Sequence, residues 1–405
     1  MAQILASIKV LDLSRYLAAP LCASILGDMG ATVYKIERPG VGDDNRHLGP
    51  FRKDAAGRDT ELSAAFMAGN RGKQSITIDI AHPEGAQLVR ELAAQCDVVI
   101  ENHKAGGLKK YGLDYESIRA IKPDIVYCSV TGFGQDGPYA ARPAFDSVIQ
   151  AMSGLMSVCG QADGAPGGEP MRSQVLIADT AAGLYAAIAV MGALYHRRET
   201  GVGQYIDLGM LETSVSVCGL FAISYLMNGI VPQRSGNSNP STAPSDVLRT
   251  KDSYLLVICS TNAQFHNLCR ALGRPEMIED PRFENNAARL VNRAAMREAI
   301  ESALITRSTA EWSDILERAG APCGAINRMD MVFDDPQILH RGVRVDVPYG
   351  DGTTVPVLRS PLRFSETPVR HGSPPMLGEY TEKVLGEVLG KSREQLDVLR
   401  AAKVI

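Results

Sequence analysis

The chain has 405 residues, more than one ordinary hydrophobic core encloses, so we expect two domains of unequal size. Its 42 basic and 46 acidic side chains leave a net charge of -4, which excludes the basic surface that nucleic acid or an anionic membrane would require. The eight cysteines show no CxxC spacing and lie in apolar stretches, which indicates reduced core thiols rather than a metal site or a disulfide framework. The partners should be small molecules or proteins.

In the first third of the chain, strand-like and helix-like segments alternate. The predicted strands are Ile8–Leu13, Thr32–Glu37, Ser75–Asp79, Asp97–Glu101 and Ile125–Thr131, and the predicted helices are Pro20–Met29 and Pro83–Gln95. Alternation of this kind is typical of an α/β fold with a parallel sheet, in which ligands bind at the carboxyl ends of the strands.

The glycine pattern GFGQDG at Gly132–Gly137 follows a predicted strand and resembles a dinucleotide-binding motif. Pro138 comes next, and no amphipathic helix opens on the third glycine. Because a pyrophosphate site needs that helix N-terminus, we interpret the segment as a turn.

Asp179 stands at the start of a helix of small residues, Ala178–Arg198. The first-turn amides of a helix carry partial positive charge, so an aspartate there is expected to be ionised and hydrogen-bonded. Gly183 and Gly192 allow other backbone or a ligand to approach closely, which predicts a buried helix. Asp179 is therefore either a nucleophile or simply an N-cap.

The pattern changes after about residue 201. A helix-like stretch is followed by a second, smaller α/β region and then by a hairpin that turns at Tyr349–Gly352. The predicted elements are helices at Leu211–Asn228, Ala263–Leu272, Arg293–Thr306 and Thr309–Ala319 and a strand at Tyr254–Cys259.

No targeting segment is evident, because Met1–Ser14 lacks a basic region and an apolar core of adequate length. The longest uncharged stretch, Thr213–Gln233, could just span a bilayer, but polar residues and Pro232 interrupt it. We therefore predict a buried core helix there and a soluble, cytoplasmic protein without a membrane partner.

Several segments in a fixed order resemble the family III CoA-transferases, a group that includes formyl-CoA transferase, carnitine CoA-transferase and α-methylacyl-CoA racemase. The resemblance runs from about residue 7 to the end and is weakest over Asn237–His340. Besides the Asp179 helix, the segments are LDLSRYLAAP (Leu11–Pro20), ATVYKIERPGVGDD (Ala31–Asp44), NRGKQSITIDI (Asn70–Ile80), DVVIENHKAGGLKKYGLD (Asp97–Asp114), VTGFGQDGPYAARPAFD (Val130–Asp146), ETGVGQYIDLGMLE (Glu199–Glu212) and LGEYT (Leu377–Thr381).

The resemblance implies a Rossmann-like large domain completed by the C-terminal tail, and two ring-like subunits interlocked as a homodimer. The implied boundaries are 1–200 with 340–405 for the large CoA-binding domain, 225–330 for the small domain, and linkers at 201–224 and 331–339.

The resemblance also implies that Asp179 is the catalytic nucleophile. It would form a mixed anhydride with the donor acyl group and then an aspartyl-CoA thioester, so that CoA reaches a carboxylic acid acceptor. Backbone amides around Asp179 and the loop Arg234–Asn237 are the predicted oxyanion and water-excluding elements. Coenzyme A is then a substrate, and no tightly bound cofactor or metal is expected.

CoA-contacting positions follow from the same resemblance, with Arg38, Lys73 and Lys110 assigned to phosphates. The full set is Leu17, Ala18, Arg38, Asn70, Arg71, Gly72, Lys73, Asn102, His103, Lys104 and Lys110.

Two departures from the family pattern bear on substrate. Leu48 occupies the place of the tryptophan gate of formyl-CoA transferase, so we expect a larger carboxylic or dicarboxylic acid, with succinyl-CoA as a candidate donor. Phe145 occupies the place of the racemase histidine and cannot transfer a proton, which favours transfer over racemisation. A racemase or a hydrolase on the same fold and a non-catalytic CoA-binding scaffold remain as alternatives.

Overall fold

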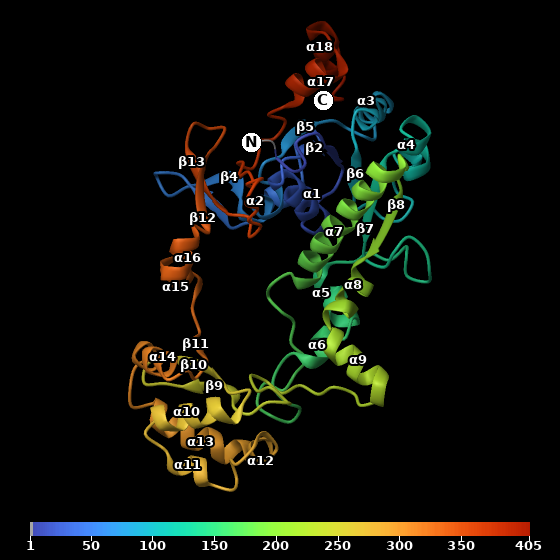
Figure 1. Ribbon diagram of the computed structural model, residues 1–405. Coiled ribbons are helices and arrows are strands. Elements are labelled where there is room, and N and C mark those ends of the chain that lie inside the picture. Colours follow the sequence, from blue (N-terminus) through green and yellow to red (C-terminus); the bar gives the residue numbers. More distant parts are fainter. Residues whose placement is uncertain (1–2) are drawn as a thin grey trace. The chain divides into compact units, whose positions relative to one another are not determined.

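The structure is a computed structural model that describes residues 3–405, and it divides into two compact units. The first unit comprises the chain up to Leu155 together with Ser173–Asn228 and Leu339–Ile405, and the second comprises Met156–Arg172 and Gly229–Ile338 (Figure 1). The predicted boundaries therefore need correction: 201–224 belongs to the first unit, and Met156–Arg172 to the second.

A six-stranded, wholly parallel sheet forms the centre of the first unit, in the order β5-β2-β1-β6-β7-β8. This confirms the predicted parallel α/β class. The chain winds outward in one direction through β2 and β5 and in the other through β6 to β8, so the switch point lies between β1 and β6. The strands are β1 (Lys9–Asp12), β2 (Thr32–Glu37), β5 (Gln74–Thr77), β6 (Val98–Glu101), β7 (Val126–Thr131) and β8 (Tyr205–Gly209).

Both faces of this sheet are covered by helices, because neighbouring residues on each strand point to opposite faces. Val10 packs with α1 and α7, and Leu11 packs with α3, α4, α17 and α18. These helices span Ala18–Asp28 (α1), Pro83–Ala94 (α3), Tyr115–Ile121 (α4), Ile177–Thr200 (α7), Thr381–Leu389 (α17) and Arg393–Ala401 (α18).

Helix α7 packs closely on α1 at Gly183, where a Cβ atom would lie only 2.6 Å from the carbonyl oxygen of Ala18. Gly192 has no such neighbour, and Ile188 and Tyr195 are each 67% exposed. The prediction of a buried helix is thus right for one face only. Among the described residues, α7 is the one unbroken helix apolar and long enough to cross a membrane, and half of its apolar window is buried within the unit, as in a core helix.

The stretch predicted as one buried core helix is instead two helices, α8 (Met210–Val217) and α9 (Gly219–Asn228), which are bent by 79°. No side chain of α9 is buried. The prediction was wrong because a long apolar run in the sequence does not show whether the surface that covers it lies in the same unit.

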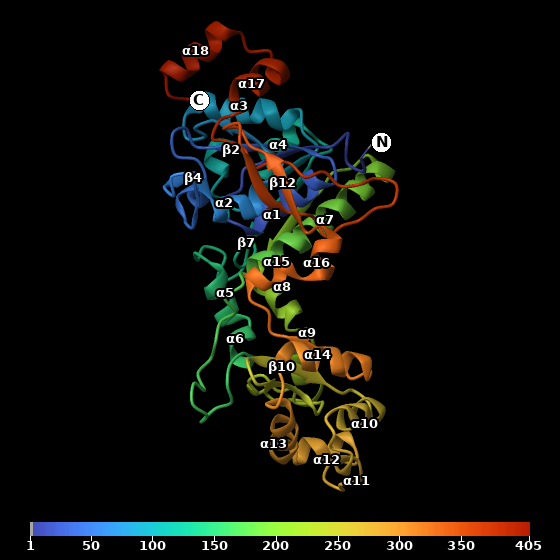
Figure 2. The same ribbon diagram turned by 90° about the vertical axis from the view of Figure 1, so that its left-hand side faces the viewer.

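The C-terminal tail completes the first unit, as expected. After the hairpin β12 (Arg344–Pro348) and β13 (Thr354–Leu358), the hydroxyl of Thr381 accepts a hydrogen bond from the amide of Thr77 at 2.9 Å. The amide of Asp79 donates to the carbonyl of Val404 at 2.8 Å. The tail therefore lies against the β5 edge of the sheet (Figure 1), and Figure 2 shows its helix α17 beside α3.

The remaining strands of the first unit form a small hairpin, β3 (Phe51–Lys53) with β4 (Asp59–Ser63). Shorter helical segments lie between the main elements of this unit. They are η1 (Asp44–His47), α2 (Ala64–Asn70), η2 (Lys109–Tyr111) and α5 (Asp146–Met152).

The second unit has a three-stranded antiparallel sheet in the order β11-β10-β9, packed with helices around its own apolar core. The indole of Trp312 donates a hydrogen bond to the carbonyl of Leu304 at 2.7 Å, so the single tryptophan is structural. The strands are β9 (Ser245–Arg249), β10 (Tyr254–Ile258) and β11 (Cys323–Ala325). The helices are α6 (Leu155–Val158), α10 (Asn262–Ala271), α11 (Glu276–Glu279), α12 (Asn286–Val291), α13 (Arg293–Leu304), α14 (Thr309–Arg318), α15 (Met329–Asp334) and α16 (Pro336–Arg341). Some residues of α6 and α16 belong to the first unit.

Candidate active site

A network of buried charges supports the carboxyl ends of the central strands. The ammonium of Lys73 lies 2.7 Å from the carboxylate of Asp12, and that of Lys35 lies 2.9 Å from Asp43, with all four side chains inaccessible. Lys35 also donates to the carbonyl of Ser14 at 2.9 Å. Burial alone would raise the pKa of Asp12, but Lys73 and Lys35 lower it below its ordinary value. This buried network therefore fixes the loop that follows β1.

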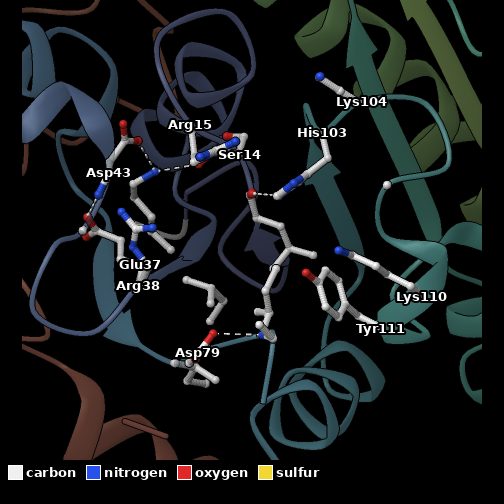
Figure 3. A pocket seen from close by; sticks show the side chains of 18 residues that line it. Ser14, Arg15, Glu37, Arg38, Asp43, Asp79, His103, Lys104, Lys110 and Tyr111 are labelled. Carbon is white, nitrogen blue, oxygen red and sulfur yellow. Dashed lines mark hydrogen bonds and ion pairs between the residues drawn. The ribbon is translucent and has the colours of Figure 1, made fainter. Parts of the chain in front are cut away.

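A cavity of about 440 Å³ opens above this network, at the strand ends and the switch point. We call it the strand-end cavity. Its cationic side chains come from three separate segments: Arg15 follows β1, Arg38 follows β2, and Lys104 and Lys110 follow β6. Figure 3 shows these side chains around the cavity. Such a set suits a ligand that carries several phosphates.

Four of the residues predicted to contact CoA line the strand-end cavity: Arg38, His103, Lys104 and Lys110. Arg38 and the two lysines are exposed, and the ammonium of Lys110 lies 4.7 Å from the ring centre of Tyr111. The Nε2 atom of His103 is 3.1 Å from the carbonyl oxygen of Leu13. Contact of these four residues with CoA remains a prediction, and their place around one cavity is compatible with it.

The run Asn70–Lys73 does not line either of the cavities described here. The Lys73 ammonium donates to Asp12, to the carbonyl of Pro20 and to the side chain of Asn70. Arg71 is paired with Asp28 at 2.5 Å. Burial lowers the pKa of Lys73 to about 8 despite its carboxylate partner. The predicted phosphate contact of Lys73 stays a prediction, but the geometry favours a structural role, because its charge is enclosed in the network.

Gly72, in the same run, has φ of +71° and approaches the backbone of Gly372 in the C-terminal tail. Its amide donates to the carbonyl of Ser373 at 2.9 Å. The run therefore ties the tail to the sheet.

A second cavity, of about 580 Å³, contains Asp179, and we call it the Asp179 cavity. It shares the wall residues Arg15, His103 and Lys104 with the strand-end cavity. Three further predicted residues, Leu17, Ala18 and Asn102, line it. Leu17 and Ala18 thus face the reactive end of the site, while Asn102 also brackets Arg15, accepting from its amide at 2.8 Å and donating to its carbonyl at 2.6 Å.

Asp179 is not the cap of its helix. Asp146, at the start of α5, accepts hydrogen bonds from the amides of Ala178 at 2.8 Å and of Asp179 at 3.1 Å. The side-chain amide of Gln150 donates to the other carboxylate oxygen of Asp146 at 2.5 Å. The capping role falls to a carboxylate about thirty residues earlier in the chain, which sequence spacing gave no means of finding.

The ionisation of Asp179 also differs from expectation. Burial first, and then repulsion from the nearby Asp146, raise the pKa of Asp179 to about 7. The helix-start environment therefore does not hold this carboxylate ionised, because Asp146 already occupies the first-turn amides. A carboxyl group that titrates near neutrality in a cavity is a strong candidate for a reactive group.

The predicted oxyanion amides are likewise engaged. Besides the two amides bound to Asp146, the amide of Ile177 donates to the carbonyl of Val175 and that of Thr180 to the carbonyl of Leu176. The prediction that amides next to Asp179 stabilise an oxyanion is therefore wrong for this structure.

The loop Arg234–Asn237 lies in the second unit and is tied to a neighbouring turn. Arg234 donates to the carbonyls of Gln161 and Gly168, both at 3.2 Å, and pairs with Asp163. The amide of Gly236 donates to the carbonyl of Gly160 at 2.9 Å. Its proposed water-excluding role remains a prediction.

Sequence reasoning assigned no binding role to two residues of the Asp179 cavity. Tyr16 lines it from the loop after β1, and Arg142 lines it from the segment before α5. The guanidinium of Arg142 lies 3.7 Å from the ring centre of Tyr139 and is exposed. Both occur in segments that resemble the family, but nothing in the residue types distinguished them from surface side chains.

The sequence matches the family described as CoA-transferase family III over residues 5–381. The chain belongs to this family. It is 41% identical over 385 residues to the succinate–glutarate CoA-transferase of Agrobacterium fabrum, with 95% of each chain covered. It is 38% identical over 402 residues to the succinyl-CoA:glutarate CoA-transferase of Mus musculus, covering 99% of this chain and 90% of that protein.

A solved structure of a CaiB/BaiF family protein from Brucella suis has the same fold, with a TM-score of 0.87 and 42% identity over 96% of this chain and 100% of that one. The protein is thus a family III CoA-transferase, an enzyme class that acts on CoA thioesters and carboxylic acids. The two cavities and their shared wall can now be considered as a site for an acyl-CoA.

Lys73 and Arg38 should behave differently when each is replaced by alanine. Lys73→Ala leaves the buried carboxylate of Asp12 without its ion-pair partner and should lower the free energy of unfolding by about 3–5 kcal/mol. Arg38→Ala should leave stability unchanged and weaken CoA binding by about 2 kcal/mol, since a charge-assisted contact is lost. Urea unfolding and calorimetry with free CoA measure the two effects.

Arg119→Ala, on the exposed surface of α4, is the matched control and should alter neither quantity. A stable Lys73→Ala protein with weakened CoA binding would reverse the assignment.

The raised pKa of Asp179 makes a second prediction. In the unfolded chain its carboxyl group titrates near pH 4, and in the folded protein near pH 7. The native protein therefore loses stability as pH rises from about 4 to 7, where only the unfolded state releases the proton. Asp179→Asn should be more stable than the native protein at about pH 8, by about 4 kcal/mol, and equal to it below about pH 4. Denaturant unfolding measures both proteins. Equal stabilities of the two across this pH range would contradict the raised pKa of Asp179.

Proposed function

We propose that this enzyme transfers CoA from succinyl-CoA or a similar thioester to a dicarboxylic acid, with Asp179 as the nucleophile. The observation that carries the proposal is the position of Asp179 in a cavity that shares a wall with the cation-lined strand-end cavity. The nucleotide part of CoA would occupy the strand-end cavity near Arg38 and Lys110, and the thioester would lie beside Asp179.

The proposed reaction begins when a carboxylate oxygen of Asp179 attacks the thioester carbonyl. The carbon–sulfur bond breaks, CoA leaves as the thiolate, and a mixed anhydride forms. The thiolate then attacks the aspartyl carbonyl, which releases the donor acid and leaves an aspartyl-CoA thioester. The acceptor carboxylate displaces the thiolate to form a second anhydride, and attack of the thiolate on the acceptor carbonyl yields the new acyl-CoA and free Asp179.

The proposal of a dicarboxylic substrate rests on the charge of the Asp179 cavity and on the relatives. Arg15, Lys104 and Arg142 line this cavity, so a second carboxylate on the acyl group would meet positive charge. Leu48 lines it as well, where formyl-CoA transferase has a tryptophan. Two relatives are named for the exchange of CoA between succinate and glutarate.

The racemase and hydrolase alternatives receive no comparable support. Phe145 lines the Asp179 cavity at the place of the racemase histidine and has no proton to transfer. His103 also lines the cavity, but its Nε2 atom is bonded to a backbone carbonyl. A protein that only binds CoA would not need a buried carboxyl group with a raised pKa such as Asp179.

We also propose that the protein acts as a homodimer in the cytoplasm. All eight cysteines are free, which suits a reducing compartment. Apolar side chains of the first unit are exposed along α7 and α9, and a soluble chain seldom leaves such a surface uncovered. They include Leu184 (49%), Ile188 (67%), Leu220 (82%), Leu226 (76%) and Met227 (81%).

Replacement of Asp179 tests the nucleophile. Asp179→Ala should abolish transfer while CoA affinity and folding persist, since a nucleophile contributes mainly in the transition state. With acyl-CoA and hydroxylamine, the native enzyme should become modified at Asp179, which mass spectrometry of the peptide would reveal. Appreciable transfer by the alanine variant would exclude this mechanism.

The pH dependence of kcat/KM tests the same role of Asp179, with two aspartate variants to compare. Because only the carboxylate attacks, kcat/KM should rise with pH through a pKa near 7. Asp146→Asn removes the repelling charge but keeps a carbonyl oxygen for the helix amides, so this acidic limb should move to lower pH. Asp54→Asn, on the exposed β3–β4 hairpin, should leave the limb in place.

The dimer is tested by light scattering coupled to size exclusion. The native chain should give twice the chain mass of 43.5 kDa. Leu220→Asp on α9 should shift the population toward monomer because it places a charge in the contact, and Val398→Asp on α18 should not. A native protein that is monomeric at micromolar concentration would contradict the proposal.

A further inference from the structure

Tyr16 has an unusual backbone conformation for its residue type. Its φ is +65°, and among the described residues only Lys403 is another non-glycine with a positive φ. A Cβ atom is unfavourable in the left-handed region, where glycine is the residue of lowest cost. The conformation therefore persists only because the surroundings enforce it, and such strain tends to occur where a side chain has a function.

Polar contacts from two different segments fix this backbone. The amide of Tyr16 donates to the carboxylate of Asp43 at 3.2 Å, and its carbonyl accepts from the side chain of Asn45 at 2.8 Å. The preceding residue, Arg15, is bound on both its amide and its carbonyl by Asn102. Asp43 is itself paired with buried Lys35. The ring of Tyr16 is thus carried by a rigid support.

The ring of Tyr16 meets the ring of Phe145 edge to face, with centroids 6.0 Å apart and an interplanar angle of 89°. Both rings line the Asp179 cavity and are otherwise exposed, at 37% and 61%. Neither ring is part of an apolar core cluster. The two rings therefore contribute to the cavity rather than to the stability of the interior.

Phe145 is fixed relative to Asp179 as well. It directly precedes Asp146, whose carboxylate binds the amides of Ala178 and Asp179. One ring is therefore tied to the strand ends, and the other is tied to the helix that carries Asp179. The backbone positions from which the two rings project are therefore set by contacts outside the aromatic pair.

We infer that Tyr16 and Phe145 form one aromatic wall that limits the length of the acyl group reaching Asp179, and so determines acyl-chain specificity. This inference deepens the proposed function and rests on it for the identity of the acyl-CoA. The remaining apolar wall residues, Leu17, Leu48, Leu176 and Met210, would contact the methylene groups of the chain. Each added methylene would then meet the rings instead of open space.

The substitution Tyr16→Gly offers an unusually clean test, because glycine accepts the local backbone and removes the ring without a cost in strain. Acyl-CoA binding is measured by calorimetry in an Asp179→Asn background, so that no turnover occurs. The native wall should favour succinyl-CoA over suberyl-CoA, and Tyr16→Gly should reduce that ratio of affinities by about tenfold or more. Phe145→Ala should also reduce this ratio of affinities. The double variant should reduce it little further, since both residues form one wall.

Lys403→Gly is the matched control, because it relieves the other positive φ in the described chain, near the C-terminus and outside both cavities. It should leave the affinity ratio unchanged. Thermal unfolding should show that Tyr16→Gly is at least as stable as its parent. A folded Tyr16→Gly protein with an unaltered ratio, or with equal losses for both ligands, would overturn the inference.

The same two aromatic substitutions are then made in the enzyme that retains Asp179, and these proteins are assayed for transfer from succinyl-CoA to dicarboxylic acids of increasing length. A native enzyme that transfers to none of them would remove the proposed function, whereas the binding ratio would still report on the wall. A native enzyme that transfers normally while the variants keep the native length profile would remove the wall alone.

Discussion

Two buried ion pairs, Asp12 with Lys73 and Lys35 with Asp43, are the constraint on which the rest of the site depends. Desolvation of four charges is costly, and removal of one partner would leave a charge uncompensated, at about 3–5 kcal/mol. The pairs persist because each charge has further hydrogen bonds to backbone or side chains, including Lys35 to Ser14. Their product is a fixed loop after β1, and that loop contributes to the walls of both cavities.

The raised pKa of Asp179 follows from a division of roles between two carboxylates. Asp146 satisfies the amides at the start of α7, so Asp179 is left without that stabilisation, is desolvated by burial and is repelled by its neighbour. If Asp179 is the nucleophile that we propose, the loss of stability near neutral pH is offset by a poorly solvated and thus more reactive carboxylate. An N-capping aspartate in the same place would be a more stable and less reactive group.

Sequence patterns predicted five of the six central strands and the parallel class. Buried parallel strands are short apolar runs, and the helices between them show a helical periodicity of apolar residues. They missed β8 (Tyr205–Gly209), whose alternating pattern includes Asp207 and which lies within the segment 201–224 that was interpreted as a linker. The ion pair of Lys73 with Asp12 was not predicted, since the sequence around a lysine does not reveal its partner and Asp12 lies sixty-one residues away in the chain. The state of Asp179 depended on Asp146, another contact between distant residues. Long-range pairing was therefore the part that the pattern could not supply.

The shared wall between the two cavities bears on why transfer would prevail over hydrolysis. CoA must leave the acyl group as a thiolate and return later, so its nucleotide end has to stay bound while its sulfur end moves. Binding of phosphates far from the reacting atoms can hold the coenzyme through both steps without slowing either one. Arg15, His103 and Lys104 line both cavities, and the backbone amides of Arg15 and His103 are fixed by Asn102 and Glu101, respectively. In the proposed mode of binding, the charge network would thus support the cavity that anchors the coenzyme, and the aromatic residues would border the reacting end.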